Sequence, residues 1–142
     1  MDLHGHDAHW LGPVDEGEIS RVERLLGVHF PSDYRRFLGE QGAGSIGSTE
    51  LYGLGCDQGR LPSRLWLIGC LEADGCVRPT VLLPVSEVGN GDYVAVLAAP
   101  LGDHAAGVAV YWSPRRDDRL DLEAAAGSFD AWLRRRLAPR KA

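Results

Sequence analysis

Cysteine is scarce in this sequence, and its pattern excludes two common kinds of small domain. Cys56, Cys70 and Cys76 form an odd set, at spacings of fourteen and six residues. A disulfide framework needs cysteines that can pair, and a zinc finger or ribbon needs cysteine pairs only about two to four residues apart. We therefore expect reduced thiols that are mostly buried in the core.

Long apolar runs are also missing. The longest, Tyr93 to Leu101, contains Pro100 and is about half as long as the ~18 residues that a membrane-spanning helix needs. The first twenty residues carry acids, no lysine or arginine, and no apolar stretch of the kind found in a secretory signal. These absences predict a cytoplasmic protein.

Lysine is nearly absent, and the basic residues are unevenly distributed. The net charge of the chain is −5, and its last nine residues hold four arginines, the single lysine and no acid, so residues 1–133 carry −10. A field of this sign repels nucleic acid and speeds association with basic partners. We expect no direct contact with nucleic acid.

Length and composition are those of an ordinary folded domain. A chain of 142 residues fits one domain and buries roughly 68% of the surface of its unfolded form. Hydrophobic residues make up 44% and charged residues 25%, which is typical of globular proteins. The expected organisation is a flexible arm over residues 1–14, a domain over residues 15–137 and a basic tail over residues 138–142.

Two helices are predicted directly after the arm. Asp15 and Glu18 form a capping pair, apolar residues recur at helical spacing, and Gly27 ends the first helix. The apolar positions are Ile19, Val22, Leu25 and Leu26. Pro31 suits the first turn of the second helix, which Gly42 ends. Its apolar face consists of Tyr34, Phe37 and Leu38.

Glycines gather after the second helix, at Gly42, Gly44 and Gly47. A phosphate-binding loop would place its glycines between a strand and a following helix, with a lysine close by. Here the glycines follow a helix, and the next stretch, "STELYGLG", is typical of a strand or turn. They are better explained as a helix cap and a tight approach to a sheet.

The second half of the chain is rich in strand patterns. A middle helix is expected over residues 61–71, weakened by Gly69. Strands are expected in "TVLLPVSEV", "YVAVLAA" and "GVAVYW", with a turn over residues 89–92, and a short strand in "RLDL", residues 119–122. Ser128 caps a last helix. Its apolar face carries Phe129, Trp132, Leu133 and Leu137. The predicted fold class is α+β, with an antiparallel sheet packed against N-terminal helices and a C-terminal helix.

The order of these blocks resembles the SUKH superfamily, which includes cell-wall regulators of the Smi/Knr type and many bacterial immunity proteins. The resemblance rests on the helix ending at Gly27 with the following Pro31 helix, on "STELYGLG", and on "LLPVSEVGNGDYVAVL" with "VAVYW" and "GSFDAWL". It covers roughly residues 15–135. It implies a binding protein without catalytic activity or cofactor.

The resemblance also suggests a partner. Bacterial members of this kind are mostly immunity proteins that neutralise toxins, commonly nucleases or deaminases, and a nuclease must be basic where it grips phosphate. An acidic inhibitor fits such a surface. The expectation is a monomer or weak homodimer that binds a basic toxin. The alternative is a regulatory or scaffold module of the same family.

Partner-binding residues are predicted among acids that border turns and strand ends, together with nearby tyrosines. They are Glu40, Glu50, Tyr52, Asp57, Glu87, Asp92, Tyr111, Asp117 and Asp118. Strand alternation assigns Trp112 to the core and leaves Tyr111 exposed.

Two patterns contain residue types that could form a catalytic or metal site. His4, His6 and His9, with Asp2 and Asp7, have suitable ligand atoms for a metal-dependent hydrolase, but their spacing lies in a segment that lacks regular structure. Asp103 beside His104 suggests acid–base chemistry, but neighbours in sequence rarely face one another, and "PLGDHAAG" is typical of a strand connection. We predict no catalytic residue and no metal site.

Overall fold

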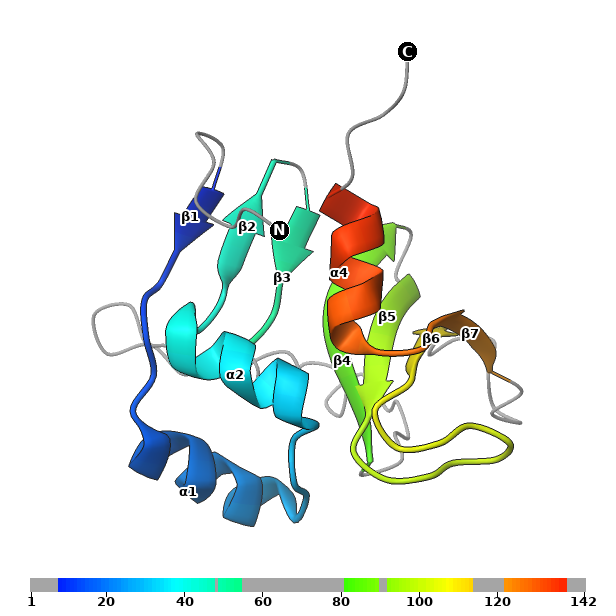
Figure 1. The fold of residues 1–142 in the computed structure, drawn as a ribbon, viewed down its shortest axis with the longest axis horizontal. Helices are drawn as coiled ribbons and strands as arrows, with labels where there is room; N and C mark the ends of the chain where they lie inside the picture. Colours follow the sequence, from blue (N-terminus) through cyan, green and yellow to red (C-terminus); the bar gives the residue numbers. More distant parts are fainter. Residues whose placement is uncertain (1–7, 48, 55–80, 90–91, 114–121, 138–142) are drawn as a thin grey trace.

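The computed structural model describes residues 8–47, 49–54, 81–89, 92–113 and 122–137 (Figure 1). The N-terminal elements are β1 (Ala8–Trp10), α1 (Glu16–Leu26), α2 (Ser32–Glu40), β2 (Gly44–Ile46) and β3 (Thr49–Leu51). They are followed by β4 (Leu82–Gly89), β5 (Asp92–Leu97), β6 (Ala109–Trp112), β7 (Glu123–Ala126) and α4 (Phe129–Leu137). The strands form two antiparallel sheets, in the orders β1-β2-β3 and β4-β5-β6-β7. The predicted α+β architecture is confirmed.

Local signals set the ends of α1. The Asp15 side chain accepts a hydrogen bond of 3.0 Å from a backbone N–H in the first turn, and Gly27 adopts φ 71° at the other end. Ile19 and Val22 are buried as expected. Leu25 is 61% exposed, because its position in the helix lies beyond the edge of the stripe that contacts α2.

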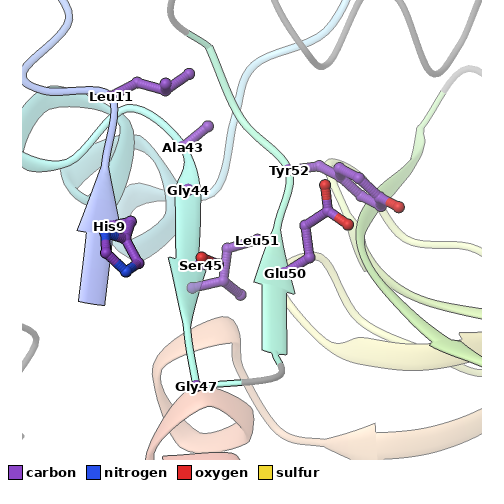
Figure 2. Close-up of a pocket in the computed structure, with 9 residues that line it drawn as sticks. All are labelled: His9, Leu11, Ala43, Gly44, Ser45, Gly47, Glu50, Leu51 and Tyr52. Atoms are coloured by element: carbon purple, nitrogen blue, oxygen red, sulfur yellow. The ribbon is translucent and has the colours of Figure 1, made fainter. Parts of the chain in front are cut away.

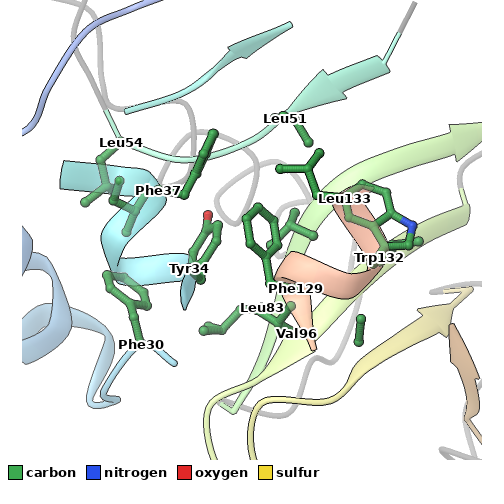
Figure 3. Packing of buried hydrophobic residues seen from close by; sticks show 14 of the residues in the cluster. Phe30, Tyr34, Phe37, Leu51, Leu54, Leu83, Val96, Phe129, Trp132 and Leu133 are labelled. Carbon is green, nitrogen blue, oxygen red and sulfur yellow. The ribbon is translucent and has the colours of Figure 1, made fainter. Parts of the chain in front are cut away.

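The core lies between the helices and the sheets (Figure 3). Tyr34, Phe37 and Leu38 of α2 are buried, which confirms the predicted apolar face. The ring of Tyr34 lies 5.1 Å from that of Phe129 on α4, in an edge-to-face arrangement. Burial of each of these rings contributes about 1.5–3 kcal/mol to folding, so this contact fixes α2 against α4.

The first described residues differ from the expected flexible arm. Ala8 to Trp10 pair with β2, and the backbone N–H of Leu11 donates to the carbonyl of Ala43 at 2.8 Å. Trp10 docks edge-on against Phe37, with ring centroids 5.8 Å apart. A three-residue strand is too short to show a recognisable alternation, so the sequence pattern did not indicate it.

Gly44 allows the close approach of β1 to β2. Its φ is 152°, and a Cβ at this position would lie 2.0 Å from the carbonyl oxygen of His9. Gly42, with φ 77°, follows α2. The interpretation of these glycines as a helix cap and a tight approach to a sheet is confirmed.

In the four-stranded sheet, alternate residues face opposite sides. Val94 and Val96 join the core under the helices, whereas Tyr93 and Trp112 belong to a second buried cluster on the other face. Trp112 is 2% exposed and Tyr111 is 44% exposed, as predicted.

The last described strand, β7, forms at Glu123–Ala126, directly after the predicted segment "RLDL". Of that segment only Leu122 is described, and it precedes the strand. Alanine has a weak preference for strands, so β7 depends on its pairing with β6 instead of on local propensity. The middle helix expected over residues 61–71 lies outside the described residues. Within the described part of the chain, no helix has the length and apolar character needed to cross a membrane.

Candidate functional site

The arginines are confined to one part of the described structure, whereas acids occur throughout it. Its arginines all lie on the three helices: Arg21, Arg24, Arg35, Arg36, Arg134, Arg135 and Arg136. From Gly44 to Ala126, the described residues include acids but no lysine or arginine: Glu50, Glu87, Asp92, Asp103 and Glu123. The residues that the structure describes in the two sheets therefore carry only negative side-chain charge, apart from the imidazole of His9.

Four acids on the helices form ion pairs with arginines. Arg35 bonds to Glu23 at 3.3 Å and also pairs with Glu16. The side-chain hydrogen bond from Arg21 holds the pKa of Glu18 below its usual value. Asp130 on α4 likewise pairs with Arg36 of α2. These acids stabilise the fold and contribute little net negative field.

The acids on the sheets lack such partners. No ion pair joins Glu50, Glu87 or Asp92 to any other residue that the structure describes. Glu50 and Glu87 are exposed, and Asp92 is half-buried. Their charge is therefore directed at solvent, where it can attract a basic partner.

Two of these acids lie at the junction of the two sheets. The backbone N–H of Tyr52 donates to the carbonyl of Val85 at 2.7 Å, and the hydroxyl of Ser86 donates to the carbonyl of Glu50 at 2.6 Å. These bonds hold the end of β3 beside β4. Glu87 directly follows Ser86, so the same contacts bring the two glutamates into one region.

Tyr52 belongs to the same junction as these two glutamates. Burial raises the pKa of its hydroxyl most, and the negative charges of Glu50 and Glu87 raise it further. Tyr52 is only 8% exposed, yet no hydrogen bond connects its hydroxyl to another side chain or backbone group in the described ranges. Figure 2 shows Glu50 and Tyr52 projecting from the same side of the chain.

A hollow of about 530 Å³ adjoins this group on the outer face of the three-stranded sheet (Figure 2). The described residues that line it are His9, Leu11, Ala43, Gly44, Ser45, Gly47, Glu50, Leu51 and Tyr52. Trp10, whose neighbours His9 and Leu11 line the hollow, packs on Phe37 of α2, so the helix covers the opposite face.

His9, Ser45 and Glu50 form a row across the three strands of this sheet. Ser45 is in register with both of the others. A nucleophile needs a hydrogen-bonded base, and no hydrogen bond among the described residues joins Ser45 to His9. The row offers polar groups for binding, with Leu11 as an apolar neighbour.

The chain matches a known protein family over nearly its whole length. The family model SUKH_5, described as SMI1-KNR4 cell-wall, matches residues 4–138. The chain belongs to the SUKH family. The resemblance stated from the sequence blocks is confirmed.

Solved structures support the same fold for this SUKH protein. A crystal structure of a protein from Pseudomonas syringae pv. tomato matches it with a TM-score of 0.65 and 20% sequence identity. The match covers 93% of this chain and 88% of the other. No curated protein matches the chain significantly.

The SUKH fold brings together only part of the predicted partner-binding set. Glu50, Tyr52 and Glu87 share one region, and Asp92 begins β5 next to Tyr93, which pairs with Glu87. Tyr111 lies on the opposite face of its sheet from Trp112. Glu40 lies on α2, which packs against the opposite face of the three-stranded sheet from the hollow. Asp57, Asp117 and Asp118 lie outside the described residues.

The sequence did not indicate that Tyr93 contacts Tyr52 or that His9 lines the hollow. The Tyr93 ring lies 6.4 Å from that of Tyr52 and 5.9 Å from that of Trp112, so it connects the junction to the second buried cluster. The alternation of Tyr93 with Ala95 and Leu97 could have indicated a shared face.

The metal and acid–base patterns gain no support from the described residues. Of the N-terminal histidines, only His9 is described, and no group of three potential metal ligands occurs within the described ranges. The Nε2 atom of His104 lies 2.7 Å from the carbonyl oxygen of Leu122, which ties the β5–β6 connection to the start of β7.

Proposed function

We propose that this SUKH protein is an immunity-type binding module that neutralises a basic protein toxin in the cytoplasm. The observation that carries the proposal is the separation of charge. Four acids of the helices, Glu16, Glu18, Glu23 and Asp130, are paired with arginines, whereas Glu50, Glu87 and Asp92 have no ion-pair partner among the described residues. Complementary charge gives fast association and selects partners of the opposite sign.

Membership of the SUKH family supports an immunity or regulatory module. The toxin class follows from chemistry. Nucleases, and deaminases that act on nucleic acid, hold phosphate groups with lysine and arginine, so an acidic protein can occupy the same surface. The inhibitor itself needs no catalysis. It needs nanomolar affinity, about −12 kcal/mol, and an interface of roughly 1,600 Å².

A regulatory or scaffold module is the second candidate. The family description, SMI1-KNR4 cell-wall, favours this role. The same acidic surface would then recruit an enzyme or scaffold protein without toxic activity. Toxicity of the partner distinguishes the two candidates.

The test is co-purification of the tagged protein with the product of the neighbouring gene, at salt from about 50 to about 500 mM. We expect a one-to-one complex that salt weakens, and growth rescue when the two proteins are expressed together. A Glu50→Gln/Glu87→Gln variant should bind more weakly, while Glu40→Gln, on the opposite face, should bind as the wild type does. No complex at any salt concentration would contradict the proposal, and a complex with a harmless partner would favour the regulatory module.

A further inference from the structure

We infer that the region formed by Glu50, Tyr52 and Glu87 is an anchor site for an arginine side chain of the partner. This inference rests on the proposed function, because it names the chemical group by which a basic partner is held. The sheet junction offers two carboxylates without ion-pair partners among the described residues, the hydroxyl of the buried residue Tyr52, and an adjoining hollow.

The hydroxyl of Tyr52 distinguishes this region from a simple cluster of negative charge. A buried hydroxyl normally has a hydrogen-bond partner, because its desolvation is otherwise uncompensated. Tyr52 is 8% exposed and lines the hollow, but its hydroxyl bonds to no other group within the described ranges. An N–H donor supplied by a bound partner would satisfy it.

The charges around this hydroxyl select a cation as that donor. The hydrogen bonds between β3 and β4 bring Glu50 and Glu87 into the region of Tyr52, and the negative charges of both raise the pKa of its hydroxyl. A neutral donor would leave the negative charge of the two carboxylates uncompensated. A cationic donor both bonds to the hydroxyl and balances the carboxylates. The strands that the structure describes supply no lysine or arginine to this region.

Arginine fits this site better than lysine. A guanidinium presents five N–H donors in a plane and binds carboxylates with two parallel hydrogen bonds, and its face stacks on aromatic rings. The site supplies four carboxylate oxygens, a phenolic oxygen and the ring of Tyr52. The stem of an arginine could lie in the hollow, where Leu11 and Ala43 offer apolar surface.

The test uses the isolated protein and a defined probe, the peptide acetyl-Gly-Arg-Gly-amide. Backbone amide resonances are followed by NMR during titration. The same peptide with citrulline in place of arginine is the uncharged control, and the peptide with lysine is the control for a cation that lacks a planar guanidinium. We expect saturable shifts around residues 50–52 and 86–88 for arginine, weaker shifts for lysine and none for citrulline.

Variants connect the shifts to the named groups. Glu50→Gln/Glu87→Gln should weaken arginine binding by at least about tenfold, and Tyr52→Phe by a few-fold. Glu123→Gln, an exposed acid on β7, should leave binding unchanged. A dispersed amide spectrum establishes that each variant is folded. Equal shifts for arginine and citrulline, or no loss in the double variant, would overturn the inference.

The two proposals can fail separately. If the whole partner binds the wild type and the double variant equally well, the binding function stands and the anchor site is wrong. If the arginine peptide binds as expected and the neighbouring gene product does not, the anchor site stands and the toxin partner is wrong.

Discussion

The hydroxyl of Tyr34, on α2, donates a hydrogen bond of 2.7 Å to the backbone carbonyl of Tyr52, eighteen residues further along the chain. Tyr34 is fully buried. The bond connects the helix under the three-stranded sheet to the residue at the centre of the proposed anchor site. The backbone of Tyr52 is thus held from the core by Tyr34 and from β4 by Val85.

Replacing Tyr34 by phenylalanine tests how much this hydrogen bond contributes to the free energy of unfolding. The variant keeps the ring and its packing but leaves the carbonyl of Tyr52 without its buried donor. We expect the free energy of unfolding to fall by about 1–3 kcal/mol. Urea denaturation measures it, with Tyr111→Phe as a matched control, because Tyr111 is 44% exposed. A loss no larger than that of the control would contradict this role of the hydroxyl.

Tyr52 makes a prediction about alkaline pH. Its pKa is raised in the folded protein from an ordinary value of 10.0, so above about pH 10 the unfolded chain loses a proton that the folded chain keeps. The stabilising contribution of this residue is therefore complete below pH 10 and declines as pH rises towards the folded pKa. The free energy of unfolding, measured from about pH 8 to about pH 11, should be less pH-dependent in Tyr52→Phe than in wild type. Equal slopes in the two proteins would contradict this prediction.

Local signals made much of the fold predictable. Asp15 and Gly27 bound α1, and the Ser128 hydroxyl accepts a hydrogen bond of 3.0 Å from the N–H of Ala131 at the start of α4. Such caps act within a few residues, so a single sequence contains the whole signal. The alternation that buries Trp112 and exposes Tyr111 is local in the same sense.

The candidate site was only partly predictable, because distant pairing assembles it. Glu50 and Ser86 meet across thirty-six residues, and no pattern in either segment names the other. The acids were identified from their positions near strand ends. Which of these acids share a surface depends on how β3 lies beside β4. Glu50 belongs to this junction, whereas Glu40 lies on α2, on the opposite face of the three-stranded sheet.

Glu23 shows how tertiary contacts override the helical pattern. It is 7% exposed, and its carboxylate accepts hydrogen bonds from the backbone of Phe30 at 2.7 Å and from Arg35 at 3.3 Å. Glu23→Ala should reduce the free energy of unfolding by about 1–3 kcal/mol, because it leaves the buried N–H of Phe30 without its acceptor, while Arg35 keeps its contacts with Glu16 and Ser20. Glu23→Gln keeps an acceptor and should lose less. Chemical denaturation would contradict this account if both variants were as stable as the wild type.

Gly44 makes a prediction about the edge strand β1. In Gly44→Ala the new methyl group would meet the His9 carbonyl at 2.0 Å in a backbone conformation with φ 152°, so β1 must shift away from β2. We expect a loss of at least about 2 kcal/mol and faster amide exchange in β1. Gly47→Ala is the control, since no atom lies within 4 Å of its added Cβ and only the strain of φ 58° remains. Equal losses would show that the close approach is unimportant.

Association kinetics with the toxin partner would separate the roles of charge and anchor. Asp92 is half-buried at the start of β5, so Asp92→Lys should lower the association rate and reduce its dependence on salt, with little change in dissociation. Tyr52→Phe keeps every charge, so it should leave the association rate unchanged and speed dissociation a few-fold by removing one hydrogen bond. Tyr111→Phe, on the other face of its sheet, should alter neither rate. If Asp92→Lys changed only the dissociation rate, this acid would not be steering the encounter. If Tyr52→Phe slowed association and left dissociation unchanged, the tyrosine would not be holding the bound state.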